Sequence, residues 1–331
     1  MNSLCKRDCN KCTHIKRCGG CSLCEAAICN NVCFKCGILC PRRGASIIYL
    51  NKIYKYNDKL KDNKILKLPY HIPIIPDKLS RILDKKISPL VGIHGGNIFS
   101  SNGEKIRRLY REKGFKEALN IEGDGILQFY VKDRTLEGIW DNRNNIYKEL
   151  KEQKFKAIIA PNFSVYEDCP RFDHLYNIQR SLTIYNELIE EGFDAIPDIS
   201  WYNINDLDFW INLINNSSCN TIAFSFQVVD VRLKASNNWK NYLSGFSYLC
   251  KNLKNIKQII IIGASSLSRV LDIKYFINDN ISIHVLNQSA YIQSQRGMYS
   301  NMRVRDIITP KDILLEKNIK YFNEIYENIN D

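Results

Sequence analysis

The chain has 331 residues, of which 45% are hydrophobic and 25% are charged, and its formal net charge is +12. These proportions are typical of a soluble globular protein. No run approaches the ~20 consecutive apolar residues that a membrane-spanning helix needs, so we predict that the protein has no membrane partner.

The first forty residues hold ten of the thirteen cysteines. A segment this short buries too little apolar surface to fold without cross-links. It lacks the apolar run of a secretory signal, so we expect a cytoplasmic protein, and a reducing cytosol favours metal over disulfides. The predicted metal ligands are Cys5, Cys9, Cys12, Cys18, Cys21, Cys24, Cys29, Cys33, Cys36 and Cys40.

Two kinds of metal centre fit this spacing. Cysteine pairs separated by two residues, such as Cys33 and Cys36, are typical of structural zinc sites. The run from Cys33 through Cys36 to Cys40-Pro41 resembles the end of the ligand sequence that bacterial ferredoxins present to a [4Fe–4S] cluster. Iron–sulfur clusters and zinc therefore both remain open as cofactors, as does the grouping of the cysteines.

The cysteine-rich segment is also basic. Residues 1–43 contain eight Lys or Arg and two acidic side chains, which gives a net charge of +6. A surface of this charge suits phosphate backbones, so DNA or RNA is a predicted partner. The alternative is that the positive charges balance the negative charge left on metal-bound thiolates.

Composition divides the chain into three regions. Residues 1–43 form the predicted metal-binding domain, residues 44–88 a transitional linker, and residues 89–331 an α/β domain. Within the linker we predict a possible strand at Ile47–Tyr54 and a short helix at Lys78–Lys85.

From residue 89 onward, β-branched apolar runs alternate with amphipathic segments. The predicted strands are Pro89–Ile93, Gly125–Val131, Phe155–Ala160, Ala195–Ser200, Thr221–Phe226, Lys257–Ile262 and Ser282–Leu286. The predicted helices are Thr135–Gln153, Asp173–Glu191, Asn205–Ile214, Trp239–Leu253 and Leu267–Ile277. This alternation predicts a parallel sheet buried on both faces, as a (β/α)8-like or incomplete barrel, with an open parallel sheet as the alternative.

Parallel α/β folds bind ligands on the loops that follow the carboxyl ends of their strands. Asp168 lies on one such loop and Asp198 lies near the end of the next predicted strand, and together with Arg171 they suit phosphate or metal-assisted chemistry. His94 follows the first strand and is a candidate acid or base. The predicted ligand-binding residues are Asn162, Ser164, Arg171, Arg180, Trp201 and Asn287. The alternative is that these side chains cap helices and pair with one another at the mouth of the barrel.

Three motifs resemble a known family. They are Ile-Ala-Pro-Asn-Phe-Ser-x-Tyr-Glu-Asp-Cys-Pro at 159–170, Asn-Ile-x-Arg at 177–180, and Ile-Pro-Asp-Ile-Ser-Trp at 196–201. Over about residues 125–290 the chain resembles domain of unknown function 4417, a family of bacteria and phages without an established activity. The resemblance implies a phage or mobile-element setting rather than a reaction, and the cysteine-rich segment is an addition to the family pattern.

We therefore predict a metal-binding, nucleic-acid-associated protein of a phage or mobile element, with a barrel-mouth site for a nucleotide-like or phosphorylated ligand. Two alternatives remain open. One is an iron–sulfur enzyme whose clusters pass electrons to the barrel, and the other is a non-catalytic, zinc-stabilised module that binds a partner protein.

Overall fold

The computed structural model describes residues 59–64, 66–165, 171–227, 237–264, 266–301 and 304–330. These ranges include most of the predicted α/β domain. The ten cysteines predicted to bind metal, and the possible strand at Ile47–Tyr54, lie outside them.

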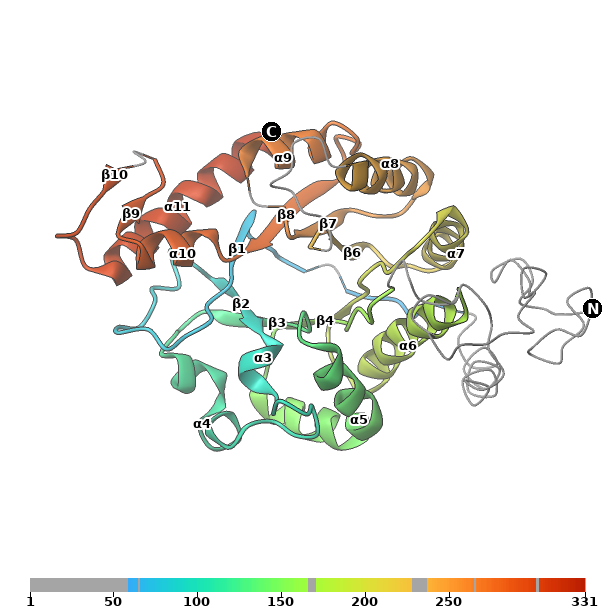
Figure 1. The fold of residues 1–331 in the computed structure, drawn as a ribbon, viewed down its shortest axis with the longest axis horizontal. Helices are drawn as coiled ribbons and strands as arrows, with labels where there is room; N and C mark the ends of the chain where they lie inside the picture. The colour runs from blue at the N-terminus through green and yellow to red at the C-terminus, as the bar shows by residue number, and fades with distance from the viewer. Residues whose placement is uncertain are drawn as a thin grey trace, which may run out of the picture.

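In the described part of the chain, eight short parallel strands and the helices between them make up an α/β architecture, whose arrangement Figure 1 shows. The parallel strands are β1 (His71–Pro73), β2 (Leu90–His94), β3 (Asp124–Gln128), β4 (Ala157–Ile159), β5 (Ala195–Ile196), β6 (Thr221–Ser225), β7 (Gln258–Ile262) and β8 (Ser282–Asn287). The helices are α3 (Gly95–Ile98), α4 (Arg108–Leu119), α5 (Asp133–Gln153), α6 (Arg171–Glu190), α7 (Ile204–Asn215), α8 (Asn237–Asn252), α9 (Leu267–Lys274), α10 (Ser289–Gln295) and α11 (Lys311–Asn330). A small antiparallel pair, β9 (Met298–Tyr299) and β10 (Val304–Arg305), lies between α10 and α11.

The eight parallel strands form two four-stranded sheets rather than one closed barrel sheet. One sheet has the order β2-β3-β4-β5 and the other the order β1-β8-β7-β6. Single parallel bridges join their edges, from Ile74 to Gly92 on one side and from Asp198 to Ala223 on the other. The predicted parallel α/β class is thus confirmed for the described residues, while β4 and β5 are shorter than predicted.

Side chains alternate between two apolar clusters along these strands, as the period of two requires. In β3, Leu127 packs in the large cluster beneath the helices, whereas Ile126 belongs to a smaller cluster between the two sheets. That inner cluster is formed by Leu66, Ile72, Ile74, Leu90, Ile126, Ala157, Ile159, Ile196, Ala223, Ile260, Ile262 and Leu286. The strands are therefore buried on both faces, which explains why their sequences are almost continuously apolar.

The helices cover the outer faces of the sheets. Figure 1 shows α4, α5 and α6 beside the sheet that contains β2, β3 and β4, and α8, α9 and α11 beside the sheet that contains β7 and β8. Helix α5 approaches the 102–103 loop so closely that a Cβ at Gly138 would lie 1.7 Å from the carbonyl oxygen of Asn102. Glycine is required at this contact because any side chain would overlap the neighbouring backbone.

Two regions before residue 120 differ from expectation. The predicted helix at Lys78–Lys85 is wrong, because this segment is irregular and Leu83 forms an isolated parallel bridge with Ile121. Strand β1 falls within residues 44–88, the segment interpreted as a linker, and pairs in parallel with β8.

Of the helices that are described, none is both long and apolar enough to cross a bilayer.

Candidate functional site

Polar side chains gather at the carboxyl ends of β3 to β6, above the inner apolar cluster. Tyr130 lies two residues beyond the end of β3, on the same face as Ile126, and its ring packs against the inner cluster. Asp198 lies two residues beyond β5, where its backbone bridges to Ala223 of β6. The bridge brings the ends of these strands together, so one site receives side chains from both sheets.

Asp198 and Tyr130 form a hydrogen-bonded pair at the centre of this site. The Tyr130 hydroxyl donates to Oδ2 of Asp198. The side chains of Asn162, after β4, and Ser225, at the end of β6, also interact with the Tyr130 hydroxyl. Asn162 interacts with the Asp198 carboxyl as well. Four consecutive strands therefore each contribute one polar group.

Burial changes the protonation of this pair. Asp198 is only 1% exposed, and burial raises the pKa of its carboxyl to about 7, although hydrogen bonds from Tyr130 and Asn162 partly oppose this. Burial and the adjacent carboxyl raise the pKa of Tyr130 well above its usual value. Asp198 therefore exchanges a proton near neutral pH while Tyr130 stays protonated as a hydrogen-bond donor.

The buried Asp198 carboxyl is hydrogen-bonded through only part of its surface in the described structure. Within the described part of the chain, Oδ1 of Asp198 has no hydrogen-bond partner, and neither does the buried hydroxyl of Ser200. Buried polar atoms are almost always paired in folded proteins, because an unpaired one carries its full desolvation cost. An unpaired buried oxygen therefore requires an explanation, and a carboxyl with a strongly shifted pKa marks this place as a candidate functional site.

The imidazole of His94 forms hydrogen bonds with nearby backbone groups. Its Nδ1 accepts a hydrogen bond from the backbone N–H of Gly96 at 2.9 Å and so caps the short helix α3. The ring also forms a hydrogen bond with the backbone of Tyr130, while burial lowers the pKa of the imidazole. His94 thus supports the segment that carries Tyr130.

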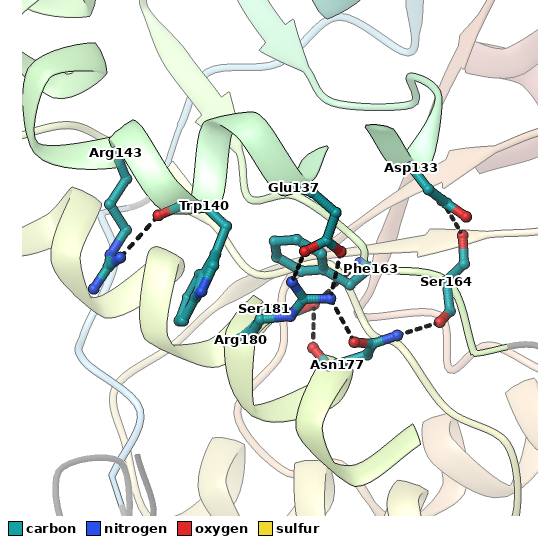
Figure 2. A network of polar contacts seen from close by, with 9 residues as sticks. All are labelled: Asp133, Glu137, Trp140, Arg143, Phe163, Ser164, Asn177, Arg180 and Ser181. Atoms are coloured by element: carbon teal, nitrogen blue, oxygen red, sulfur yellow. Dashed lines mark hydrogen bonds and ion pairs between the residues drawn. The ribbon is translucent and has the colours of Figure 1, made fainter. Parts of the chain in front are cut away.

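Arg180 lies in a separate network between α5, α6 and the loop after β4 (Figure 2). Its guanidinium donates to both carboxylate oxygens of Glu137, at 2.7 and 2.8 Å, and to Oδ1 of Asn177 at 2.6 Å. It also stacks on the Phe163 ring, with the guanidinium carbon 4.0 Å from the ring centroid. Figure 2 shows Phe163 beside the Arg180–Glu137 pair and Ser164 beside Asn177 and Asp133. These two residues directly follow Asn162.

Comparison with known proteins places this site in a family. The model of the family described as "Domain of unknown function (DUF4417)" matches residues 109–280, just over half of the chain. The chain belongs to this family. The DUF4417 segment contains Tyr130, Asn162, Asp198 and Ser225, whereas His94 and Asn287 lie outside it.

Two phage proteins are also similar to part of the chain. The Gene 1 protein of Mycobacterium phage L5 is 28% identical over 101 residues, which are 30% of this chain and 42% of that protein. The Gene 1 protein of Mycobacterium phage D29 is 26% identical over 101 residues, which are 30% of this chain and 36% of that protein. The alignments thus span less than half of either relative.

The remaining predicted ligand-binding residues do not all point to the Asp198 site. The Ser164 hydroxyl donates to Oδ1 of Asp133 at 2.8 Å, within the Arg180 network. Trp201 packs toward α8, where a Cβ at Gly245 would lie 2.3 Å from its ring. Asn287 faces α11, and its amide donates to the Tyr326 hydroxyl at 3.3 Å.

Two site predictions cannot be placed. Asp168 lies outside the described residues, and so does the side chain of Arg171, the first residue of α6. The predicted Asp168/Asp198 pair therefore stays a prediction. Among the described residues, no group of three or more His, Cys, Asp or Glu side chains could hold a metal ion.

The predicted site residues did not include Tyr130, Ser225 or Glu137 of the DUF4417 segment. Tyr130 is central to the Asp198 site, and the signal was its spacing of four from the inward-facing Ile126, beyond the end of the strand. Glu137 pairs with Arg180 across 43 positions, and no pattern in a single sequence relates two positions so far apart.

Proposed function

We propose that the DUF4417 domain is an enzyme that moves a proton to or from a bound ligand at the Asp198–Tyr130 pair. The observation that carries this proposal is a buried carboxyl whose pKa is about 7, with Oδ2 held by Tyr130 and Oδ1 unpaired among the described residues. A group of this pKa can accept or donate a proton at physiological pH. Structural carboxyls, by contrast, are usually paired and stay ionised.

The roles of the individual residues follow from the contacts. As a carboxylate, Asp198 takes a proton from an O–H or N–H of the ligand at Oδ1, and as an acid it returns that proton. Tyr130 stays protonated and stabilises the carboxylate form through Oδ2. Asn162 stabilises the same form, and Ser225 interacts with the Tyr130 hydroxyl from the other sheet.

The architecture supports a site of this kind. We infer that the two sheets form an interrupted (β/α)8-like barrel, since bridges join their edges at Ile74 and at Asp198 and a single apolar cluster fills the space between them. In such barrels the ligand binds at the carboxyl ends of the strands. The Asp198 site lies at these ends, above an apolar floor.

The chemistry of the site favours the uncharged part of a nucleotide-like ligand. Among the described residues, the side chains that influence the protonation of Asp198 are Tyr130 and Asn162, and neither of them is a cation that could bind a phosphate. Carboxyl, amide and phenol groups instead match a nucleobase or ribose edge, where donors and acceptors lie side by side.

Thermal unfolding of the full chain with a series of nucleosides would test this proposal. We expect at least one nucleoside to raise the midpoint for the wild type, and Asp198→Ala to abolish that shift. Asp208→Asn is the matched control, because it alters an exposed carboxylate on α7 that accepts a hydrogen bond from the Tyr248 hydroxyl. A series in which no nucleoside acts between pH 6 and 8, or in which Asp198→Ala responds like the wild type, would contradict it.

We further propose, from the sequence alone, that the ten N-terminal cysteines bind iron–sulfur clusters or zinc and that the basic segment contacts DNA or RNA. Ten cysteines and a net charge of +6 within 43 residues support both parts. Metal analysis after anaerobic purification separates iron with sulfide from zinc. Nucleic-acid binding that is absent at low salt, or that does not weaken as salt rises, would contradict the second part.

A further inference from the structure

Arg180 is a buried arginine in the network around residues 163–164, and it makes no described contact with Asp198. Its side chain is 5% exposed, and its guanidinium is directed to Glu137 and Asn177 rather than to Asp198. The bidentate ion pair fixes the plane of the guanidinium, because two parallel N–H groups meet two carboxylate oxygens. A guanidinium fixed in this way can fix the positions of the side chains that stack on it or accept hydrogen bonds from it.

The groups held are the two residues that follow Asn162. The guanidinium covers the face of Phe163 at 4.0 Å, and the Phe163 N–H donates to the Ser181 hydroxyl at 3.4 Å. The Ser164 carbonyl accepts a hydrogen bond from the Asn177 amide at 2.6 Å, while Arg180 fixes the other end of that amide. The segment 163–164 is thus held through its ring, its N–H and its carbonyl.

Asn162 connects this network to the pair at the barrel mouth. It is the residue immediately before Phe163, and its side chain interacts with both Asp198 and Tyr130. Among the described groups that influence Asp198, Tyr130 is the only one that titrates, and none carries a charge. A displacement of residues 163–164 would therefore move the Asn162 amide and change its interaction with the Asp198 carboxyl.

We propose that Arg180 and Asn177 are positioning residues that clamp the segment 163–164 and thereby hold the Asn162 amide against the Asp198–Tyr130 pair. This proposal rests on the proposed function of that pair. It assigns to the Asn-Ile-x-Arg motif a structural connection with the site rather than direct contact with a ligand.

The test measures the protonation of Asp198 directly, by carbon-13 NMR titration of the full chain labelled at the aspartate side-chain carboxyl. Asp198→Asn identifies the resonance. Because the Asn162 interaction favours the carboxylate, Asn162→Ala should raise the titration midpoint of Asp198 by about half a pH unit or more, the size of one ordinary hydrogen bond. Arg180→Gln should raise it in the same direction, and adding it to Asn162→Ala should produce no further change.

Two matched variants separate clamping from charge and from general destabilisation. Arg180→Lys keeps the charge but loses the bidentate, planar contact, so it should behave like Arg180→Gln. Arg143→Gln removes a similar arginine, which pairs with Glu187 at 2.9 Å and covers Trp140 at 4.3 Å but makes no described contact with residues 162–164. It should leave the Asp198 midpoint unchanged. If Arg180→Gln fails to fold, Asn177→Ala removes the same hold on Ser164 and should raise the midpoint.

The outcomes distinguish the two proposals. A wild-type Asp198 that titrates near its ordinary value contradicts the proposed function and removes the basis of the clamp. A wild-type midpoint near neutral pH that neither Arg180→Gln nor Asn177→Ala alters overturns the clamp alone. The clamp is also overturned if Arg180→Lys keeps the wild-type midpoint.

Discussion

Replacing Asp198 by asparagine should change how the stability of the protein depends on pH. The pKa of Asp198 is about 7 in the folded protein against an ordinary value of 3.8, so between these values the folded state binds more protons than the unfolded state. By linkage, the free energy of unfolding falls as pH rises through this window and levels off above pH 7. An asparagine side chain has nearly the same shape but no titrating proton, so the Asp198→Asn variant lacks this loss.

The difference between the two pKa values sets the magnitude. At about 1.4 kcal/mol per pH unit, the window from 3.8 to about 7 corresponds to at most about 4 kcal/mol. Roughly 3 kcal/mol of this falls between pH 5 and pH 8.5, because ionisation in the unfolded state is already under way at pH 5. Asp198 is 1% exposed, so solvent screening does not reduce the effect much.

Urea unfolding followed by tryptophan fluorescence, at pH 5 and pH 8.5 under reducing conditions, would measure this effect. From pH 5 to pH 8.5, the free energy of unfolding of the wild type should fall by roughly 3 kcal/mol more than that of Asp198→Asn. All other titrating groups cancel in this comparison. Asp208→Asn, which removes an exposed carboxylate, should follow the wild type. Parallel pH profiles for the wild type and Asp198→Asn would refute the argument that Asp198 is buried and titrates near neutrality.

Three further predictions follow from the same contacts. Tyr130→Phe removes a hydroxyl that donates to Asp198 and should raise the pKa of that carboxyl, and an unchanged NMR titration would speak against the pairing. Gly138→Ala places a methyl group 1.7 Å from the Asn102 carbonyl and should lower the free energy of unfolding by about 1–3 kcal/mol in urea titrations, whereas equal stability would mean that α5 does not pack as described. His94→Ala removes the side chain that caps α3 and should lower the free energy of unfolding by about 1 kcal/mol. Amide hydrogen exchange at residues 95–98 should become faster, and unaltered exchange would show that His94 does not cap the helix.

Much of the fold could be predicted because the alternation of apolar runs and amphipathic segments is strong. Helices α5, α7 and α8 begin and end within a few residues of their predicted bounds. Strands β4 and β5 have only three and two residues, whereas six were predicted for each. The length of a strand is set by how many hydrogen bonds it makes with the adjacent strand, and that strand lies elsewhere in the sequence. The helix predicted at Lys78–Lys85 failed for a related reason, since Leu83 bridges to the distant Ile121.

The site was predicted in part. Asn162 was singled out because it follows a predicted strand and Asp198 because it lies near the end of another, and the structure brings the two side chains together. Arg180 was predicted to bind a ligand, but its guanidinium pairs with Glu137, which comes from another helix. A single sequence shows that a charge is present and does not show which distant side chain neutralises it.

The amino-acid sequence by itself determined the parallel α/β class, the membership in DUF4417 and the presence of a basic, cysteine-rich N-terminal segment. These depend on local periodicity, on composition and on motifs, all of which can be read along the chain. Only the tertiary structure decided that Asp198 meets Tyr130 across 68 positions and that its carboxyl is removed from water. The pKa of that carboxyl depends on desolvation, which arises only when separate strands pack around it.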